Sequence, residues 1–375
     1  MSTIRVMLND KPQRVAVIGA GIAGASCAHA LTLAGHSVHV FDKSRGPGGR
    51  MATRRLEWID RHGEAHATAI DHGAVGISAS SAAFRAFVAQ ASRGGVLVDW
   101  TPTMPAGSLP LECGDRLYVP VPAMPALCRF LLDGAQTTWS FAIDRLRKGP
   151  LGWQVESDGE CHPGQFDTVL LALPPAQAAP LLGPHRTDWA RHASVVPMQP
   201  CWTLMGIADE PDDAADPALD WDLARPPTGP LACVMRSDGR PGRTRVNGEA
   251  HWVAHARPGF SRRHLEQPAS WVQRQMQAAM ADWLGRAIEW QHCSVHRWRY
   301  ALPLQQARSP APSGACWWDA AQSLGACGDF LGNAGVEGAW LSGQALSRAV
   351  LRALNDPGAL ANARPCQDSL PRLVA

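Results

Sequence analysis

The fold is decided by residues 14–42, which read RVAVIGAGIAGASCAHALTLAGHSVHVFD. The apolar run 14–18 is typical of a buried strand, the glycines after it open a helix over 22–33, and 37–41 is a second short strand. Strand, glycine turn, helix and strand form the βαβ unit with which a doubly wound fold begins. The sequence therefore predicts an α/β protein that contains a Rossmann-type unit.

The glycine fingerprint GAGIAG at 19–24 carries the first chemical signal. Its first glycine permits a tight turn, its second lets a diphosphate approach the backbone, and its third allows helix and strand to pack closely. The helix amino terminus then offers free N–H groups to phosphates. Asp42 ends the second strand, eighteen residues after Gly24, where a carboxylate accepts the hydroxyl protons of a ribose. The pattern predicts a dinucleotide site, and a fortuitous glycine turn is the alternative.

Two further glycine segments indicate which dinucleotide is bound. Residues 43–53, KSRGPGGRMAT, add a glycine doublet and Arg50, which place N–H groups and a cation near a diphosphate. The segment resembles the glycine doublet of amine-oxidase-like flavoproteins; a basic surface loop is the other interpretation. In that superfamily a Gly-Asp like that of ACGDF at 326–330 contacts the ribityl chain. The helix after it, here GVEGA at 335–339, points its amino terminus at the flavin. Together the motifs predict FAD, and no histidine or cysteine lies in a motif for covalent attachment.

Composition narrows the class of partner. A chain of 375 residues exceeds the usual single core and predicts two lobes. A net charge of +2 with no long run of one sign argues against nucleic acid or a membrane surface as partner. The ten cysteines contain no C-x-x-C, so no metal site is predicted, and Cys27 and Cys233 are interpreted as small buried hydrophobes. The first residues lack the apolar core of a signal peptide, which predicts a cytoplasmic protein.

The remaining pattern predicts further elements and a division into lobes. The expected elements are a helix at 83–91, loop with short strands at 101–125, a helix at 127–132, strands around Gly149 and Gly159, a buried parallel strand at 168–173, a surface excursion at 209–230, an amphipathic helix at 270–288 with Val272, Met276, Ala279 and Trp283 on one face, a strand at 325–326 and a helix at 336–354. The predicted FAD-binding lobe comprises 1–80, 110–185 and 312–375, and the substrate lobe 81–109 and 186–311.

Six segments together resemble a bacterial renalase-like protein of the amine-oxidase-like flavoprotein superfamily. They are GAGIAG (19–24), DKSRGPGGRMATRR (42–55), AIDHGA (69–74), HWVAHA (251–256), VHRWRYA (295–301) and CGDFLGNAGVEGAWLSGQALSRAV (327–350). The resemblance spans residues 14–354 and implies p-hydroxybenzoate-hydroxylase-like topology, in which an FAD lobe accompanies a β-sheet substrate lobe. Renalases oxidise misplaced dihydro isomers of NAD(P)H and pass the electrons from flavin to oxygen.

The motifs and the resemblance assign site residues. The expected FAD contacts are Gly19, Ala20, Gly21, Ile22, Ala23, Gly24, Asp42, Lys43, Gly48, Gly49, Arg50, Met51, Ala52, Gly73, Ala74, Val75, Gly76, Gly328, Asp329, Val336, Glu337 and Ala339. The candidates for the substrate pocket are His255, Trp298, Arg299 and Tyr300. No proton-transfer residue is assigned, because hydride transfer needs placement more than acid–base help. Three of these candidates also have a structural interpretation: His255 as a satisfied histidine, Trp298 as a core tryptophan and Arg299 as an arginine paired with a nearby acid.

The sequence departs from the family pattern at one turn. After Asp71-His72-Gly73-Ala74 the family has glutamine and an aromatic residue, whereas this chain has Val75-Gly76. The departure concerns the substrate more than the cofactor. The leading hypothesis is oxidation of a small, nucleotide-like reduced substrate, with oxygen as acceptor. A flavin amine oxidase acting on a small amine and a non-catalytic flavin-binding redox sensor are the alternatives.

Overall fold

The computed structural model describes residues 12–60, 62–111, 114, 116–209, 221–246, 248–304 and 315–355, which fold as two compact units. Unit 1 comprises Met1–Gly49, Cys128–Val196 and Gln305–Ala375, and unit 2 comprises Arg50–Leu127 and Pro197–Leu304. The expected division differs at 50–80 and 110–127, which lie in unit 2, and at 186–196, which lie in unit 1. The first two stretches pair locally in hairpins and add no strand to the sheet of unit 1. Residues 187–195 form a helix that packs against the helix 175–182 of unit 1. The end of the expected substrate lobe, 305–311, and two parts of the expected FAD-binding lobe, 312–314 and 356–375, lie outside the described residues.

Unit 1 is built on a six-stranded sheet in the order β17-β18-β11-β1-β2-β7. Its strands are β1 (Arg14–Ile18), β2 (Ser37–Phe41), β7 (Gln136–Thr138), β11 (Thr168–Leu171), β17 (Cys316–Asp319) and β18 (Leu324–Cys327). All pair in parallel except β17, which pairs antiparallel with β18. The buried apolar side chains of the central strands are those expected of a parallel sheet covered on both faces.

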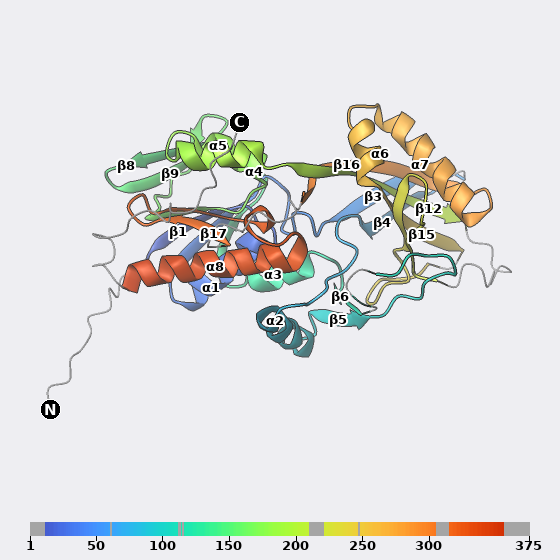
Figure 1. The fold of residues 1–375 in the computed structure, drawn as a ribbon, viewed down its shortest axis with the longest axis horizontal. Coiled ribbons are helices and arrows are strands. Elements are labelled where there is room, and N and C mark those ends of the chain that lie inside the picture. Colours follow the sequence, from blue (N-terminus) through green and yellow to red (C-terminus); the bar gives the residue numbers. More distant parts are fainter. Residues whose placement is uncertain are drawn as a thin grey trace, which may run out of the picture. The chain divides into compact units, whose positions relative to one another are not determined.

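Helices cover both faces of this sheet (Figure 1). One face carries α1 (Ile22–Leu33) and α8 (Gly335–Asn355), and the other carries α4 (Pro175–Leu182) and α5 (Thr187–Val195). The helices α1 and α8 can approach closely because Gly343 has no side chain. A Cβ at this position would collide with the Ala23 carbonyl. The Ser26 hydroxyl also donates to the Trp340 carbonyl at 3.0 Å. Unit 1 further contains a small sheet of β8 (Arg145–Gly149), β9 (Gly152–Ser157) and β10 (Glu160–Cys161), and the short helix η2 (Asp329–Leu331).

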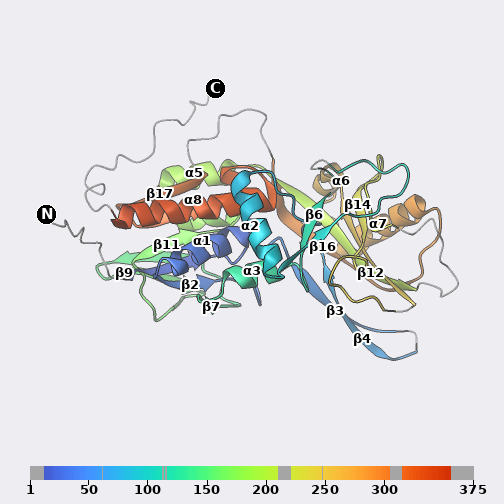
Figure 2. The ribbon, with the colours of Figure 1, turned by 90° about the horizontal axis from the view of Figure 1, so that it is seen from below.

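Unit 2 is built on a five-stranded antiparallel sheet in the order β13-β14-β15-β12-β16. Its strands are β12 (Met198–Asp209), β13 (Leu223–Ala224), β14 (Leu231–Arg236), β15 (Glu249–Ala256) and β16 (Trp290–Pro303). The unit also contains the hairpins β3 (Thr53–Ile59) with β4 (Ala65–Asp71) and β5 (Leu97–Trp100) with β6 (Leu117–Pro120), and the helices α2 (Ala82–Arg93), α6 (Pro258–Arg263) and α7 (Ala269–Leu284) (Figure 2). The helix α3 (Ala126–Leu131) crosses the boundary between the units.

The two faces of the unit 2 sheet differ in chemistry. Side chains alternate along a strand, so one face is defined by Leu204, Ala254 and Val295. These residues share an apolar core with Val272 and Met276 of α7. The opposite face carries the alternate positions of the same strands, which are polar and aromatic at several places. We call this second face the polar face, and it includes Thr203 and His255.

Most predicted elements are confirmed, and two bounds and one surface assignment are corrected. The strands 14–18 and 37–41 and the helix 22–33 have the predicted bounds. The predicted helix 270–288 ends at Leu284, because Gly285 adopts a left-handed conformation (φ 67°) that terminates it. The strand predicted over 168–173 ends at Leu171. The surface excursion predicted at 209–230 is wrong at 221–226, where Leu223 and Ala224 are buried in β13, whereas 227–229 are exposed and 210–220 lie outside the described residues.

A further prediction concerns the burial of two cysteines. Cys27 and Cys233 are buried, as predicted, and burial raises the pKa of the Cys233 thiol to about 12. In the described part of the chain, no helix has the length and apolar content that crossing a bilayer requires.

Candidate functional site

The glycine motifs of unit 1 meet at one edge of its sheet. Since β1, β11 and β18 are parallel, their carboxyl ends lie at the same edge. Gly19 follows β1 and Gly328 follows β18, so two motifs separated by about three hundred residues of chain open at this edge. Gly19 has φ 109°, and a Cβ there would collide with the Ala172 carbonyl that follows β11. Ligands of open α/β sheets bind at such an edge.

The glycine doublet lies directly against the fingerprint. Gly48 donates its N–H to the Ala20 carbonyl at 3.0 Å and forms a parallel bridge with Gly21. Gly49 has φ 55°, and a Cβ on it would lie 3.2 Å from the Cα of Gly21. The two loops therefore approach backbone to backbone, and the glycine at 49 permits the close contact. This contact favours the cofactor interpretation of the doublet over a surface loop, while the exposed Lys43 side chain stays a predicted contact only.

The first turn of α1 suits a diphosphate. It contains no acidic side chain, and no side chain caps its N–H groups. The carboxylate of Asp42 is held beside it, accepting from the Ala20 N–H and from the Ser44 N–H, each at 2.8 Å. A carboxylate has further lone pairs, which leaves acceptor capacity for ribose hydroxyls. The donors, the glycine backbone and the placed acid together fit the adenosine diphosphate part of FAD.

The third motif connects β18 to α8. Asp329 is 2% exposed and accepts from the N–H of Gly335, the first residue of α8, at 3.3 Å. The Ser342 hydroxyl accepts from the Gly328 N–H at 2.8 Å and donates to the Ala315 carbonyl. These bonds fix the start of α8 against the strand end. The predicted contacts Val336, Glu337 and Ala339 lie in the first turns of that helix.

The predicted cofactor contacts of unit 2 form one local structure. The His72 N–H donates to the Ala52 carbonyl at 3.1 Å, and the Ala74 N–H donates to the Arg50 carbonyl at 2.9 Å. Gly73 has no room for a Cβ against that same carbonyl. Residues 50–52 and 72–74 thus extend the β3–β4 hairpin, and Met51 is buried within it. The Arg50 guanidinium donates to the Ala301 carbonyl at 3.0 Å, and its contact with a diphosphate stays a prediction.

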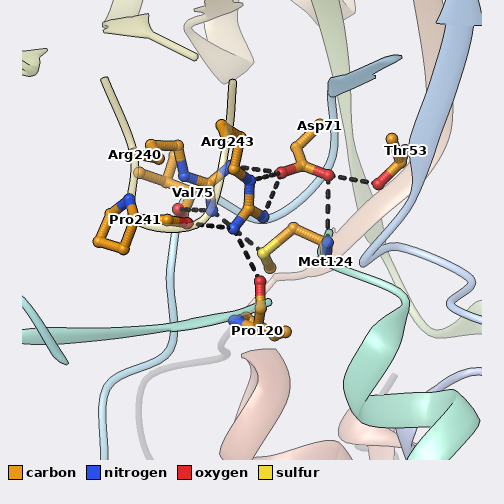
Figure 3. A network of polar contacts seen from close by, with 8 residues as sticks. All are labelled: Thr53, Asp71, Val75, Pro120, Met124, Arg240, Pro241 and Arg243. Atoms are coloured by element: carbon orange, nitrogen blue, oxygen red, sulfur yellow. Dashed lines mark hydrogen bonds and ion pairs between the residues drawn. The ribbon is translucent and has the colours of Figure 1, made fainter. Parts of the chain in front are cut away.

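A buried ionic network adjoins this hairpin, and sequence reasoning missed it (Figure 3). Asp71 accepts from Arg240 at 3.2 Å, from the Arg243 Nε at 2.8 Å, from the Met124 N–H at 3.1 Å and from the Thr53 hydroxyl. Arg240 also donates to the Val75 carbonyl at 2.7 Å. The network therefore holds the turn 71–76 to the loop 240–243. No local sequence pattern predicts the partners of Asp71, because they come from distant parts of unit 2.

The network carries more positive than negative charge. Two guanidiniums share the single carboxylate of Asp71, and the side chains of Arg240 and Arg243 are 0% and 8% exposed. Burial acts to raise the pKa of Asp71, but the two guanidiniums outweigh it and hold this pKa below its usual value. Burial also lowers the pKa of Arg240 to about 10. The surroundings of this network are therefore electropositive.

The polar face of the unit 2 sheet presents a cross-strand row of reactive or hydrogen-bonding side chains. In register across four strands lie Cys233, His255, Thr203 and His296. Trp298 is two residues beyond His296 on β16 and pairs with Cys201, so it occupies the same face. The structure thus brings together two of the predicted substrate contacts, His255 and Trp298.

Three rings gather on this face. His72 stacks on Trp298 with centroids 5.0 Å apart, and His296 meets these two rings edge to face at 4.9 and 4.4 Å. The Trp298 indole N–H donates to the His72 carbonyl at 3.3 Å. We call His72, His296 and Trp298 the ring group. Burial lowers the pKa of His72 to about 3 and that of His255 to about 4, so both imidazoles are neutral at physiological pH.

The other two substrate candidates behave differently. Arg299 points away from the ring group by strand alternation and forms a two-bonded ion pair with Glu266, at 2.6 and 3.0 Å. The structural interpretation of Arg299, an ion pair with a nearby acid, is therefore the correct one. Tyr300 shares the strand parity of Trp298 and is half-buried.

Fold and site define a protein with a Rossmann-like dinucleotide-binding unit and a β-sheet second unit. Residues 17–91 match a family described as an NAD(P)-binding Rossmann-like domain. Among curated proteins, a 207-residue stretch is 28% identical to a tRNA 5-methylaminomethyl-2-thiouridine biosynthesis bifunctional protein from Magnetococcus marinus, covering 45% of this chain and 30% of that protein. A 50-residue stretch is 48% identical to an L-amino-acid oxidase from Crotalus adamanteus, covering 13% of this chain and 10% of the oxidase. The chain thus spans less than a third of each relative.

Solved structures share the fold over nearly the whole chain. Cyclohexylamine oxidase from Brevibacterium oxydans superposes with a TM-score of 0.62 at 13% identity, covering 92% of this chain and all of that one. A reduced UDP-galactopyranose mutase superposes with a TM-score of 0.64 at 11% identity, covering 95% of this chain and 98% of that one. At such identities the likeness establishes the fold, which this chain shares with oxidases and with the mutase.

Proposed function

We propose that this protein is an FAD-dependent oxidoreductase that removes a hydride from a reduced, nucleotide-type substrate, a dihydro isomer of NAD(P)H, with oxygen as electron acceptor. The observation that carries the proposal is the backbone contact between the fingerprint and the glycine doublet at the carboxyl edge of the sheet. This double loop goes beyond the single glycine turn that a nicotinamide dinucleotide requires.

The residues of unit 1 have separate tasks in this proposal. The free N–H groups of the first turn of α1 hold the diphosphate, and Asp42 accepts the ribose hydroxyls. Asp329 sets the position of the α8 amino terminus, whose dipole favours negative charge placed before it. FAD, when bound, supplies the two-electron acceptor. The chain contributes placement and exclusion of water rather than an acid or a base.

The neutral histidines of unit 2 support this division of tasks. Because burial keeps the pKa of His72 near 3 and that of His255 near 4, neither imidazole is charged in the pH range of a cell. A neutral imidazole places no charge beside a planar substrate and donates no acidic proton to it, and hydride transfer needs no proton partner at the donor carbon.

Oxidation of a small amine is the second candidate, and the fold shared with cyclohexylamine oxidase favours it. The charges of the Asp71 network disfavour an amine substrate. The only carboxylate described in the Asp71 network is already shared by two guanidiniums, so no acid there is free to hold an ammonium group.

The test begins with the absorbance spectrum of the purified protein, which we expect to be yellow or to take up FAD when it is offered. The loaded protein is then mixed without oxygen with partially borohydride-reduced NAD, which contains the dihydro isomers. We expect the flavin absorbance to bleach with this mixture and to remain with common amines. Bleaching by an amine alone reverses the order of the two enzymes. Bleaching only by dithionite indicates a non-catalytic flavin protein, and a colourless protein that takes up no FAD overturns the proposal.

A further inference from the structure

Arg54 lies at the edge of the ring group. It belongs to β3, and its Nη1 approaches the Nδ1 of His296 at 3.4 Å. That distance is long for a hydrogen bond, so His296 holds the guanidinium only weakly. A guanidinium has five N–H donors in a planar fork, which matches a carboxylate or a phosphate. Arg54 is also exposed, unlike the two arginines of the Asp71 network.

Several buried polar atoms on the polar face lack a hydrogen-bond partner. Within the described residues, these include the Nδ1 of His72, the Nε2 of His255 and the Oγ of Ser294. Ser294 and His296 lie two residues apart on β16, so they share the face. Buried polar atoms in folded proteins are almost always paired with protein, water or a ligand. Three such atoms on one face, beside half-buried rings, indicate a binding surface rather than a finished core.

The charged side chains around this surface determine whether a positively or a negatively charged ligand is favoured. The charge of Arg54 contributes, after burial, to lowering the pKa of His72 and of His296. The charge of Arg240 does the same at His255. A nearby positive charge therefore acts on the pKa of each of the three imidazoles. A negative group is favoured at this surface and an ammonium group is disfavoured.

We propose that Arg54 and the ring group form a binding site for a planar ring that carries a negative group. The ring lies against the half-buried faces of His296 and Trp298, and the negative group is held by the Arg54 guanidinium. This inference rests on the proposed function and deepens it, because a nucleotide-type substrate offers both a planar ring and negative phosphates, and the carboxylate of nicotinate stands in for the negative group in the test below.

The test uses three pyridines that share one ring and differ in charge: nicotinate, nicotinamide and 3-(aminomethyl)pyridine. Their dissociation constants are measured by calorimetry on the full-length protein at low salt, with whatever flavin it retains. We expect nicotinate to bind about tenfold more tightly than nicotinamide, and the aminomethyl compound to bind most weakly. In Arg54→Gln we expect the preference for nicotinate to disappear. Arg55→Gln is the matched control, because Arg55 is the next residue of β3 and points to the other face of the hairpin.

The outcomes separate this inference from the proposed function, since binding of these pyridines requires no flavin reduction. A charge preference that Arg54→Gln abolishes and Arg55→Gln retains supports the site, even if dihydronicotinamides do not bleach the flavin. Equal affinities for nicotinate and nicotinamide, a preference for the aminomethyl compound, or equal losses in the two variants overturn it. In Trp298→Leu we expect all three pyridines to weaken together, because the ring contact is common to them; unchanged affinities would also contradict the site.

Discussion

The substitution Asp71→Asn tests how far unit 2 depends on its buried ionic network. It removes the negative charge and leaves the guanidiniums of Arg240 and Arg243 buried without a carboxylate. Removing one partner of a buried ion pair costs about 3–5 kcal/mol, because the remaining charge loses its compensation without regaining water. Carbonyl acceptors at Val75 and Pro120 remain and keep the cost within that range. Against the ~5–15 kcal/mol typical of a domain, the loss is large.

The measurement is urea unfolding of the full chain, followed by tryptophan fluorescence. Because the chain has two units, the transition need not be two-state, so midpoints are compared rather than extrapolated free energies. We expect the midpoint of the transition that reports unit 2 to fall by roughly a quarter or more.

Asp99→Asn is the matched control for Asp71→Asn. Asp99 also receives two hydrogen bonds from one arginine, Arg116, at 2.8 and 2.7 Å, and the pair belongs to unit 2. Its side chains, however, are 54% and 63% exposed, so water compensates for the lost partner. We expect little change in the control. If the two substitutions lower the midpoint equally, burial of the Asp71 network is not what makes it stabilising, and the reasoning fails.

Three other predictions follow from the site and its surroundings. In Gly49→Ala we expect FAD uptake, measured by absorbance titration, to be lost, because a Cβ would press on the opposite loop at a positive φ; Gly46→Ala, where nothing lies within 4 Å, should retain it, and equal uptake would contradict the double-loop site. In Arg299→Gln we expect unchanged steady-state kinetics, since the arginine is bound to Glu266 at the surface; a tenfold higher KM would instead place it in the pocket. Burial lowers the pKa of His255 to about 4, so unfolding takes up a proton near pH 5, and urea titration should show a free energy of unfolding lower at pH 5 than at pH 7.5 by up to about 2 kcal/mol. In His255→Gln this part of the pH dependence should disappear, and an unchanged dependence of the free energy of unfolding on pH would refute the prediction.

The core of unit 1 could be predicted from the sequence because its signals are local. The fingerprint, the helix after it and the strand that precedes Asp42 occupy one continuous stretch, and glycines mark where the backbone can take conformations that other residues avoid. Even the contact between Gly21 and Gly49 follows a short excursion of chain, and both glycines were assigned to one ligand. Here local propensity and the global fold agree.

Unit 2 could be predicted only in outline, because its site depends on register. The row that joins Cys233, His255, Thr203 and His296 exists because four strands pair with one alignment, and a shift of one residue in any strand would turn its side chain to the other face. Nothing in the segments HWVAHA or VHRWRYA states that alignment. For the same reason the sequence pattern groups Arg299 with Trp298 as a pocket candidate, although adjacent residues of a strand face opposite sides.

The departure of this chain at Val75-Gly76 has a structural explanation within unit 2. Arg240 binds the carbonyl of Val75 and not its side chain, so the path of the turn does not depend on which side chain residue 75 carries. At residue 76 the opposite holds, because a Cβ there would lie 3.1 Å from the side chain of Leu117. An aromatic residue at 76, such as the resemblance leads one to expect, requires Leu117 to move. Glycine at 76 and leucine at 117 are therefore coupled, and the exchange changes what the turn offers to a ligand while the buried arginine preserves its shape.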